Sequence, residues 1–90
     1  MPSYLVETFL ARGIAGERRV RERRARSAAE AMTRDGTLVG FQGSIYVPED
    51  ETCFFTFAAP SRREAELVAQ QAGLEPLRVV EAIPSGTEES

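Results

Sequence analysis

Residues 37–64 read TLVGFQGSIYVPEDETCFFTFAAPSRRE, and this stretch predicts the middle of the fold. Residues 37–47 alternate between two kinds of side chain, and residues 52–58 are rich in aromatic and β-branched residues, so both segments are expected to be strands. Pro48 and the acids after it form a short turn, which makes the two strands antiparallel. A helix is expected to begin at residues 60–64.

The flanking segments predict a strand, a helix and, after the second helix, a last strand. Residues 4–10 and 77–83 have strand composition, and residues 17–34 form a helix that ends at Asp35-Gly36. The order β-α-β-β-α-β is that of an α+β ferredoxin-like fold, a four-stranded antiparallel sheet with two helices on one face. We expect residues 1–84 to form a single domain and residues 85–90 a disordered tail.

Composition restricts the class of protein. The chain has 90 residues and a net charge of −3, so we expect one small domain whose core gains from oligomerisation. Its single cysteine allows no internal disulfide, which is typical of a cytoplasmic protein. No stretch is apolar enough for a membrane-spanning helix, and the first residues do not form a signal peptide.

The face of the sheet that the helices leave bare is the expected functional surface. Uninterrupted alternation places Val39, Phe41, Ile45, Val47, Cys53, Phe55 and Phe57 under the helices. It leaves on the open face Gln42, Ser44, Tyr46, Phe54 and Thr56, together with Glu7, Glu81, Leu5, Phe9, Leu77, Val79 and Ile83. Such a half-apolar face is expected to be covered by a second copy, by a small ligand, or by both.

Six residues of this face are candidates for ligand binding: Glu7, Gln42, Ser44, Tyr46, Thr56 and Glu81. Glu7 and Glu81 would serve as a general base or metal ligand if buried, or as ion-paired acids at a dimer rim. Ser44 and Tyr46 would either bind a ligand or pack across strands. Cys53 falls on the core face, and the chain has no histidine to activate it, so we predict a buried apolar role.

The arginines form the strongest charge feature. All basic residues are arginine, and residues 11–34 contain eight of them against three acids. Glu17–Arg21 and Glu22–Arg26 are four-residue pairs, which indicates a solvated helix face and not a nucleic-acid site. The acidic turn at residues 49–51 lacks the spacing of a calcium loop. No triad, zinc cluster or phosphate loop is present, so we predict neither catalytic residues nor a cofactor.

Three segments resemble a known family. MPSYLVE (1–7), SIYVPEDETCFFTFAAPS (44–61) and AGLEPLRVVEAI (72–83) resemble small actinobacterial proteins grouped as a domain of unknown function, which includes nickel-binding, nickel-responsive members. The resemblance implies a ferredoxin-like dimer from a bacterium and nickel binding in some members. Because no histidine is present, no ligand position transfers, and we expect a member that lacks the nickel site.

Three functions are compatible with the sequence. The first is a non-catalytic dimeric protein that holds a small ligand or a weakly bound metal at the open face. The second is an enzyme of the dimeric α+β barrel kind, a cofactor-free monooxygenase or isomerase, in which Glu7, Tyr46 or Glu81 transfers protons to or from an apolar substrate. The third is an interaction module whose arginine-rich helix docks on an acidic partner.

Overall fold

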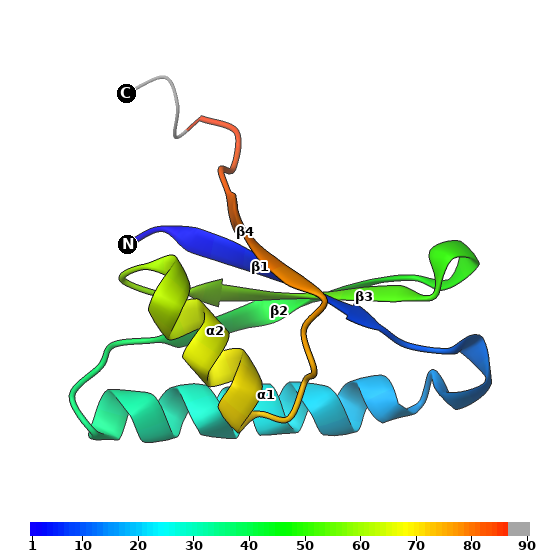
Figure 1. Cartoon of the computed structure of the whole chain (residues 1–90), viewed down its shortest axis with the longest axis horizontal. Coiled ribbons are helices and arrows are strands. Elements are labelled where there is room, and N and C mark those ends of the chain that lie inside the picture. The colour runs from blue at the N-terminus through cyan, green and yellow to red at the C-terminus, as the bar shows by residue number, and fades with distance from the viewer. Residues whose placement is uncertain (87–90) are drawn as a thin grey trace.

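Four strands and two long helices make up the structure, a computed structural model that describes residues 1–86 (Figure 1). The strands are β1 (Ser3–Phe9), β2 (Gly40–Val47), β3 (Thr52–Ala58) and β4 (Arg78–Ala82), and the helices are α1 (Glu17–Arg34) and α2 (Arg62–Gln71). Two short 3-10 turns, Arg12–Ile14 and Pro48–Asp50, lie in the connections. The predicted order of elements is confirmed.

The strands form one antiparallel sheet in the order β2-β3-β1-β4. Both helices lie on the same side of it (Figure 1), so the fold is the predicted α+β ferredoxin-like one. Figure 1 shows the sheet edge-on with both helices below it. No described helix covers the other face of the sheet, and of the residues outside the strands only Ile83 and Pro84, just after β4, line a groove on it.

The core lies between the sheet and the helices. Phe55 and Phe57 of β3 are fully buried there, as is Val6 of β1. The helices contribute mainly small side chains, such as Ala25 in α1 and Ala65 in α2, which let the helix backbones approach the aromatic rings closely. The sequence also carries local signals that set where the helices end.

The end of α1 shows how those signals act. Gly36 has a φ of +103°, a conformation that favours glycine, and the Thr37 N–H donates to the Met32 carbonyl at 2.9 Å. The helix thus stops where the sequence predicts. Ser85 and Gly86 form a turn, and the rest of the predicted tail at 85–90 lies outside the described residues. Among residues 1–86, neither helix has the length and hydropathy needed to cross a membrane.

A β-bulge interrupts β2 and overturns the predicted alternation. Phe41 pairs with Phe57, but the next partner of β3, Thr56, pairs with Gly43, so Gln42 is an extra residue. Beyond the bulge each side chain lies on the face opposite to the predicted one. Ser44 and Tyr46 turn toward the helices, where they lie opposite the buried residues Phe55 and Cys53. Ile45 and Val47 turn to the open face, where we had expected Ser44 and Tyr46.

The register of β4 corrects the prediction at the other edge of the sheet. Val79 pairs with Val6 and Glu81 with Tyr4, and both partners are core residues of β1. Directly opposed residues share a face, so Val79 and Glu81 lie on the helix side and not on the open face. The residues of β4 that lie on the open face are Arg78, Val80 and Ala82.

The bulge generates a matched pair of stability predictions. A Cβ at Gly40 or at Gly43 would meet no atom within 4 Å, yet only Gly43 has a left-handed φ, at +134°. Gly43→Ala should therefore lower the free energy of unfolding by about 1–3 kcal/mol. Gly40→Ala should leave it unchanged or raise it by up to about 1 kcal/mol, because the unfolded chain loses freedom. Urea denaturation measures both; equal effects would contradict the role given to the bulge.

Candidate functional site

The open face of the sheet is built from rows of side chains that cross the strands. One row contains Ile45, Phe54, Glu7 and Arg78, in the order β2-β3-β1-β4. The next row contains Gly43, Thr56, Leu5 and Val80. Leu5, Phe9 and Phe54 thus lie where the sequence predicts, and the bulge adds Ile45 and Val47 to them. The face is consequently more apolar than predicted.

An open groove of about 340 Å³ lies on this face, at the end of the sheet where β1 begins and β4 ends. Its lining is formed by Ser3, Leu5, Gln42, Thr56, Ala82, Ile83 and Pro84. The Ser3 hydroxyl donates a hydrogen bond to the Gln42 side-chain oxygen at 3.1 Å, which joins the two strands that flank β3. Gln42 and Thr56 are the two predicted ligand-binding residues that the groove brings together.

Glu7 lies in the row beside the groove, on the open face as predicted. Its carboxylate accepts a hydrogen bond from Arg78 Nε at 2.9 Å, and the Glu7 side chain retains 27% of its exposure. This is the ion-paired acid that the sequence left as one alternative. An exposed pair of this kind contributes only about 0–1 kcal/mol of stability.

Ser44 and Tyr46 lie on the other side of the sheet and bind the protein itself. The Ser44 hydroxyl accepts from Arg18 Nε at 2.8 Å and donates to Glu22 at 2.5 Å, while Arg18 Nη2 donates to the Ser44 carbonyl at 2.9 Å. The Tyr46 hydroxyl donates to the Leu10 carbonyl at 2.8 Å. These contacts hold α1 and the chain just after β1 against β2, so the predicted placement of both residues on the open face is wrong.

Glu81 is also separated from the predicted site. It lies on the helix side of β4, an outer strand, with its side chain exposed. The three groups suggested for proton transfer are therefore divided: Glu7 lies on the open face, and Tyr46 and Glu81 lie on the helix side. Within residues 1–86 no arrangement brings all three to one substrate.

Cys53 is fully buried on the core face, as predicted. Burial raises the pKa of its thiol, and the nearby Arg18 and Arg21 guanidinium groups only partly oppose that shift. A thiol with a raised pKa carries little thiolate near neutral pH and is a poor nucleophile. The geometry therefore agrees with a structural role for this residue.

The arginines of α1 divide into two groups. Arg18 and Arg21 are partly buried, whereas the other arginines of α1 are exposed. The Arg21 guanidinium donates to the Phe9 carbonyl at 2.9 Å. It also lies 3.8 Å from the Glu17 carboxylate, so the predicted Glu17–Arg21 pair forms. The second predicted pair does not form, because Glu22 accepts from Ser44 and Arg26 lies over the Phe41 ring. The sequence reasoning missed the structural role of Arg18 and Glu22, which bind Ser44. A glycine inside a strand often marks a bulge, so Gly43 was the signal that could have indicated these contacts.

Comparison with known proteins shows the fold. The crystal structure of SCO4226 from Streptomyces coelicolor A3(2) superposes with a TM-score of 0.67 over 93% of this chain and 99% of that chain, at 20% sequence identity. Its Streptomyces source fits the small actinobacterial family that the sequence resembles. No protein-family model matches the chain, and the search of the curated proteins finds no match.

The donor set of this chain does not fit the nickel that the resemblance implies for some members. The chain has no histidine, and its single cysteine is buried in the core. In the described residues 1–86, no group of three or more histidine, cysteine, aspartate or glutamate side chains could hold a metal ion. Nickel favours imidazole nitrogen, and the remaining carboxylates suit magnesium, calcium or manganese better.

We therefore predict that nickel does not bind tightly. Calorimetric titration of nickel chloride into the protein, with any histidine tag removed, should show no event tighter than about micromolar, which corresponds to about −8 kcal/mol. Zinc chloride serves as a second probe under the same conditions. A stoichiometric, submicromolar nickel isotherm would overturn the argument from the missing histidines.

Proposed function

We propose that this protein is a non-catalytic, homodimeric binding protein of the bacterial cytoplasm that holds a small ligand on the open face of its sheet. The observation that carries the proposal is the groove lined by Ser3, Leu5, Gln42 and Thr56. It lies on a broad, largely apolar surface that no described helix covers. Concave, mostly apolar sites with a few polar groups are the usual form of small-molecule sites.

The lining of the groove indicates the class of ligand. Its polar groups are the hydroxyls of Ser3 and Thr56 and the amide of Gln42, all of them neutral, and no charged side chain is part of it. Leu5 and Ile83 supply apolar contact. A small, uncharged, mainly apolar molecule with one or two hydrogen-bonding groups therefore fits best, because a charged one would lose its hydration without gaining a partner.

The apolar surface around the groove supports the homodimer. Phe9 is 56% exposed and Ile45 is 59% exposed, and both lie on the open face. Phe54, Leu5 and Val80 lie on the same face, so apolar side chains from all four strands contribute to this surface. A two-fold arrangement of the same face in both copies would remove these side chains from water and close the groove.

The enzyme alternative has less support. It required Glu7, Tyr46 or Glu81 beside a substrate, but only Glu7 lies on the open face, and its carboxylate is engaged by Arg78. Tyr46 is held by the Leu10 carbonyl on the opposite side of the sheet. A binding function needs only the groove and its neutral polar groups, so the geometry favours it.

The ligand class is tested with indole, a neutral aromatic with one N–H donor. Its addition to ¹⁵N-labelled protein should shift the amide resonances of Leu5 and Thr56, and Gln42→Leu should weaken binding about three- to tenfold by removing an acceptor. Gln71→Leu, at an exposed amide on α2, is the matched control and should change nothing. Equal binding of benzoate, or indole shifts confined to other surfaces, would contradict the proposed ligand class.

The dimer is tested separately at Ile45. Ile45→Glu places a charge in the proposed interface, so sedimentation velocity should show a dimer for the native protein and a monomer for the variant. Leu67→Glu is the matched control, because Leu67 is 39% exposed on α2, away from the open face, and this variant should remain dimeric. A monomeric native protein, or loss of the dimer in both variants, would count against the interface.

A further inference from the structure

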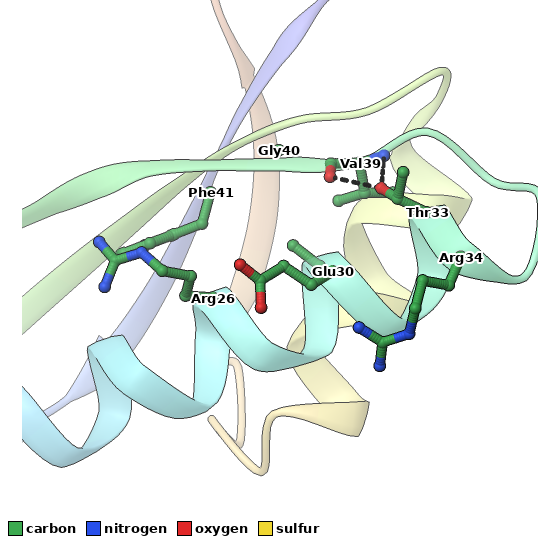
Figure 2. Close-up of a pocket in the computed structure, with 8 residues that line it drawn as sticks. Arg26, Glu30, Thr33, Arg34, Val39, Gly40 and Phe41 are labelled. Atoms are coloured by element: carbon green, nitrogen blue, oxygen red, sulfur yellow. Dashed lines mark hydrogen bonds between the residues drawn. The ribbon is translucent and has the colours of Figure 1, made fainter.

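A second groove, of about 530 Å³, lies between α1 and the edge strand β2, on the helix side of the sheet. Figure 2 shows Arg26, Glu30 and Arg34 following one another along α1, with Val39 and Phe41 of the opposite wall. Apolar side chains, among them Ala29 and Phe41, form part of the lining. The groove thus combines an apolar wall, charged side chains and the free edge of a sheet.

Side chains of α1 bind the backbone of the β2 edge at two points. The Thr33 hydroxyl accepts from the Val39 N–H at 3.2 Å and donates to the Val39 carbonyl at 3.0 Å (Figure 2). Arg18 donates to the Ser44 carbonyl at 2.9 Å. Val39 and Ser44 therefore each direct backbone groups away from β3, toward the outside of the sheet. Such contacts block the pairing of long foreign strands along an edge.

Phe41 lies between these two points and is left open. Residues of an antiparallel strand bond alternately to one side and to the other, so Phe41, two residues after Val39, directs its N–H and carbonyl outward as well. The bulge at Gln42 then brings Ser44 to the same orientation. In residues 1–86, no side chain hydrogen-bonds to the Phe41 backbone, in contrast to Val39 and Ser44.

Charge at the groove favours a carboxylate. The Arg26 guanidinium carbon lies 5.5 Å from the centre of the Phe41 ring, which holds the cation over the side chain of the residue whose backbone is open. Within the described part of the chain, the two ion pairs involve neither Arg26 nor Arg34. Two arginines, Arg26 and Arg34, and one acid, Glu30, line the groove, so its net charge is positive.

We propose that this groove binds a short acidic peptide in extended conformation. The peptide pairs with the N–H and carbonyl of Phe41 as a short added strand, and one of its carboxylates binds Arg26. Arg34, beyond Glu30 on the same helix, also lines the groove and adds to its positive charge. The contacts of Thr33 and Arg18 restrict pairing to the few residues around Phe41. This site is on the opposite side of the sheet from the small-ligand groove and does not depend on it.

Peptides of six residues in which glutamate alternates with valine or threonine provide the test. Titrated into ¹⁵N-labelled protein, they should shift the amide resonances of Val39, Gly40 and Phe41, which line this groove. Arg26→Gln should weaken binding about tenfold, as expected for a charge-assisted hydrogen bond. Arg23→Gln is the matched control, an exposed arginine of α1 outside this groove, and should change the affinity less than about twofold.

Chemical variants of the peptide separate pairing from simple attraction. Methylation of the backbone nitrogen that pairs with Phe41 should abolish the shifts, and replacement of glutamate by lysine should abolish binding. Several results would overturn the proposal: no binding at millimolar peptide, equal losses in the Arg26 and Arg23 variants, or shifts confined to the open face. So would equal competition by a thymidine oligonucleotide with no dependence on Arg26, which would indicate a nonspecific phosphate-binding helix.

Discussion

The β-bulge at Gln42 and Gly43 is the constraint on which the arrangement of both surfaces depends. Gly43 adopts a φ of +134°, which an L side chain rarely adopts, and this allows one extra residue in β2. From that point every side chain of the strand changes face. Ser44 and Tyr46 contact α1 and Leu10, the residue after β1, and Ile45 and Val47 enlarge the apolar open face. A single glycine conformation thereby makes one face more apolar and anchors the helix on the other.

Helix α1 has two structural roles that its arginine-rich composition does not indicate. Its alanines pack on the aromatic core, while polar side chains at its sheet-facing border bind the edge of β2: Arg18 and Glu22 at Ser44, and Thr33 at Val39. An edge strand exposes unpaired backbone groups that attract other strands. The contacts from α1 occupy part of that edge and limit what can pair with the remainder. The arginine-rich sequence is therefore partly structural, and the other arginines remain on the surface.

The face on which a candidate residue lies was predictable wherever the side chains of its strand alternate without interruption. Glu7, Thr56 and Gln42 lie on the open face as expected, because β1 and β3 alternate regularly and Gln42 precedes the change of phase. Ser44 and Tyr46 follow the bulge and were assigned to the wrong face. Glu81 was misassigned for a different reason: two acids, Glu7 and Glu81, were given the same face, whereas the register pairs Glu7 with Arg78. The groove beside β2 could not be foreseen, since it forms between residues that are distant in the sequence.

The sequence by itself determined the order of the elements, with bounds that differ from the structure by up to three residues, and through that order the ferredoxin-like fold. Those features depend on local properties: strand and helix propensity, the glycines that end helices and the short turn between β2 and β3. Only the tertiary structure decided which side chains share a surface. Register and bulges are set by contacts between strands, and a shift of one residue moves every side chain of a strand to the other face. For that reason the fold could be derived from the chain alone, and the composition of its two grooves could not.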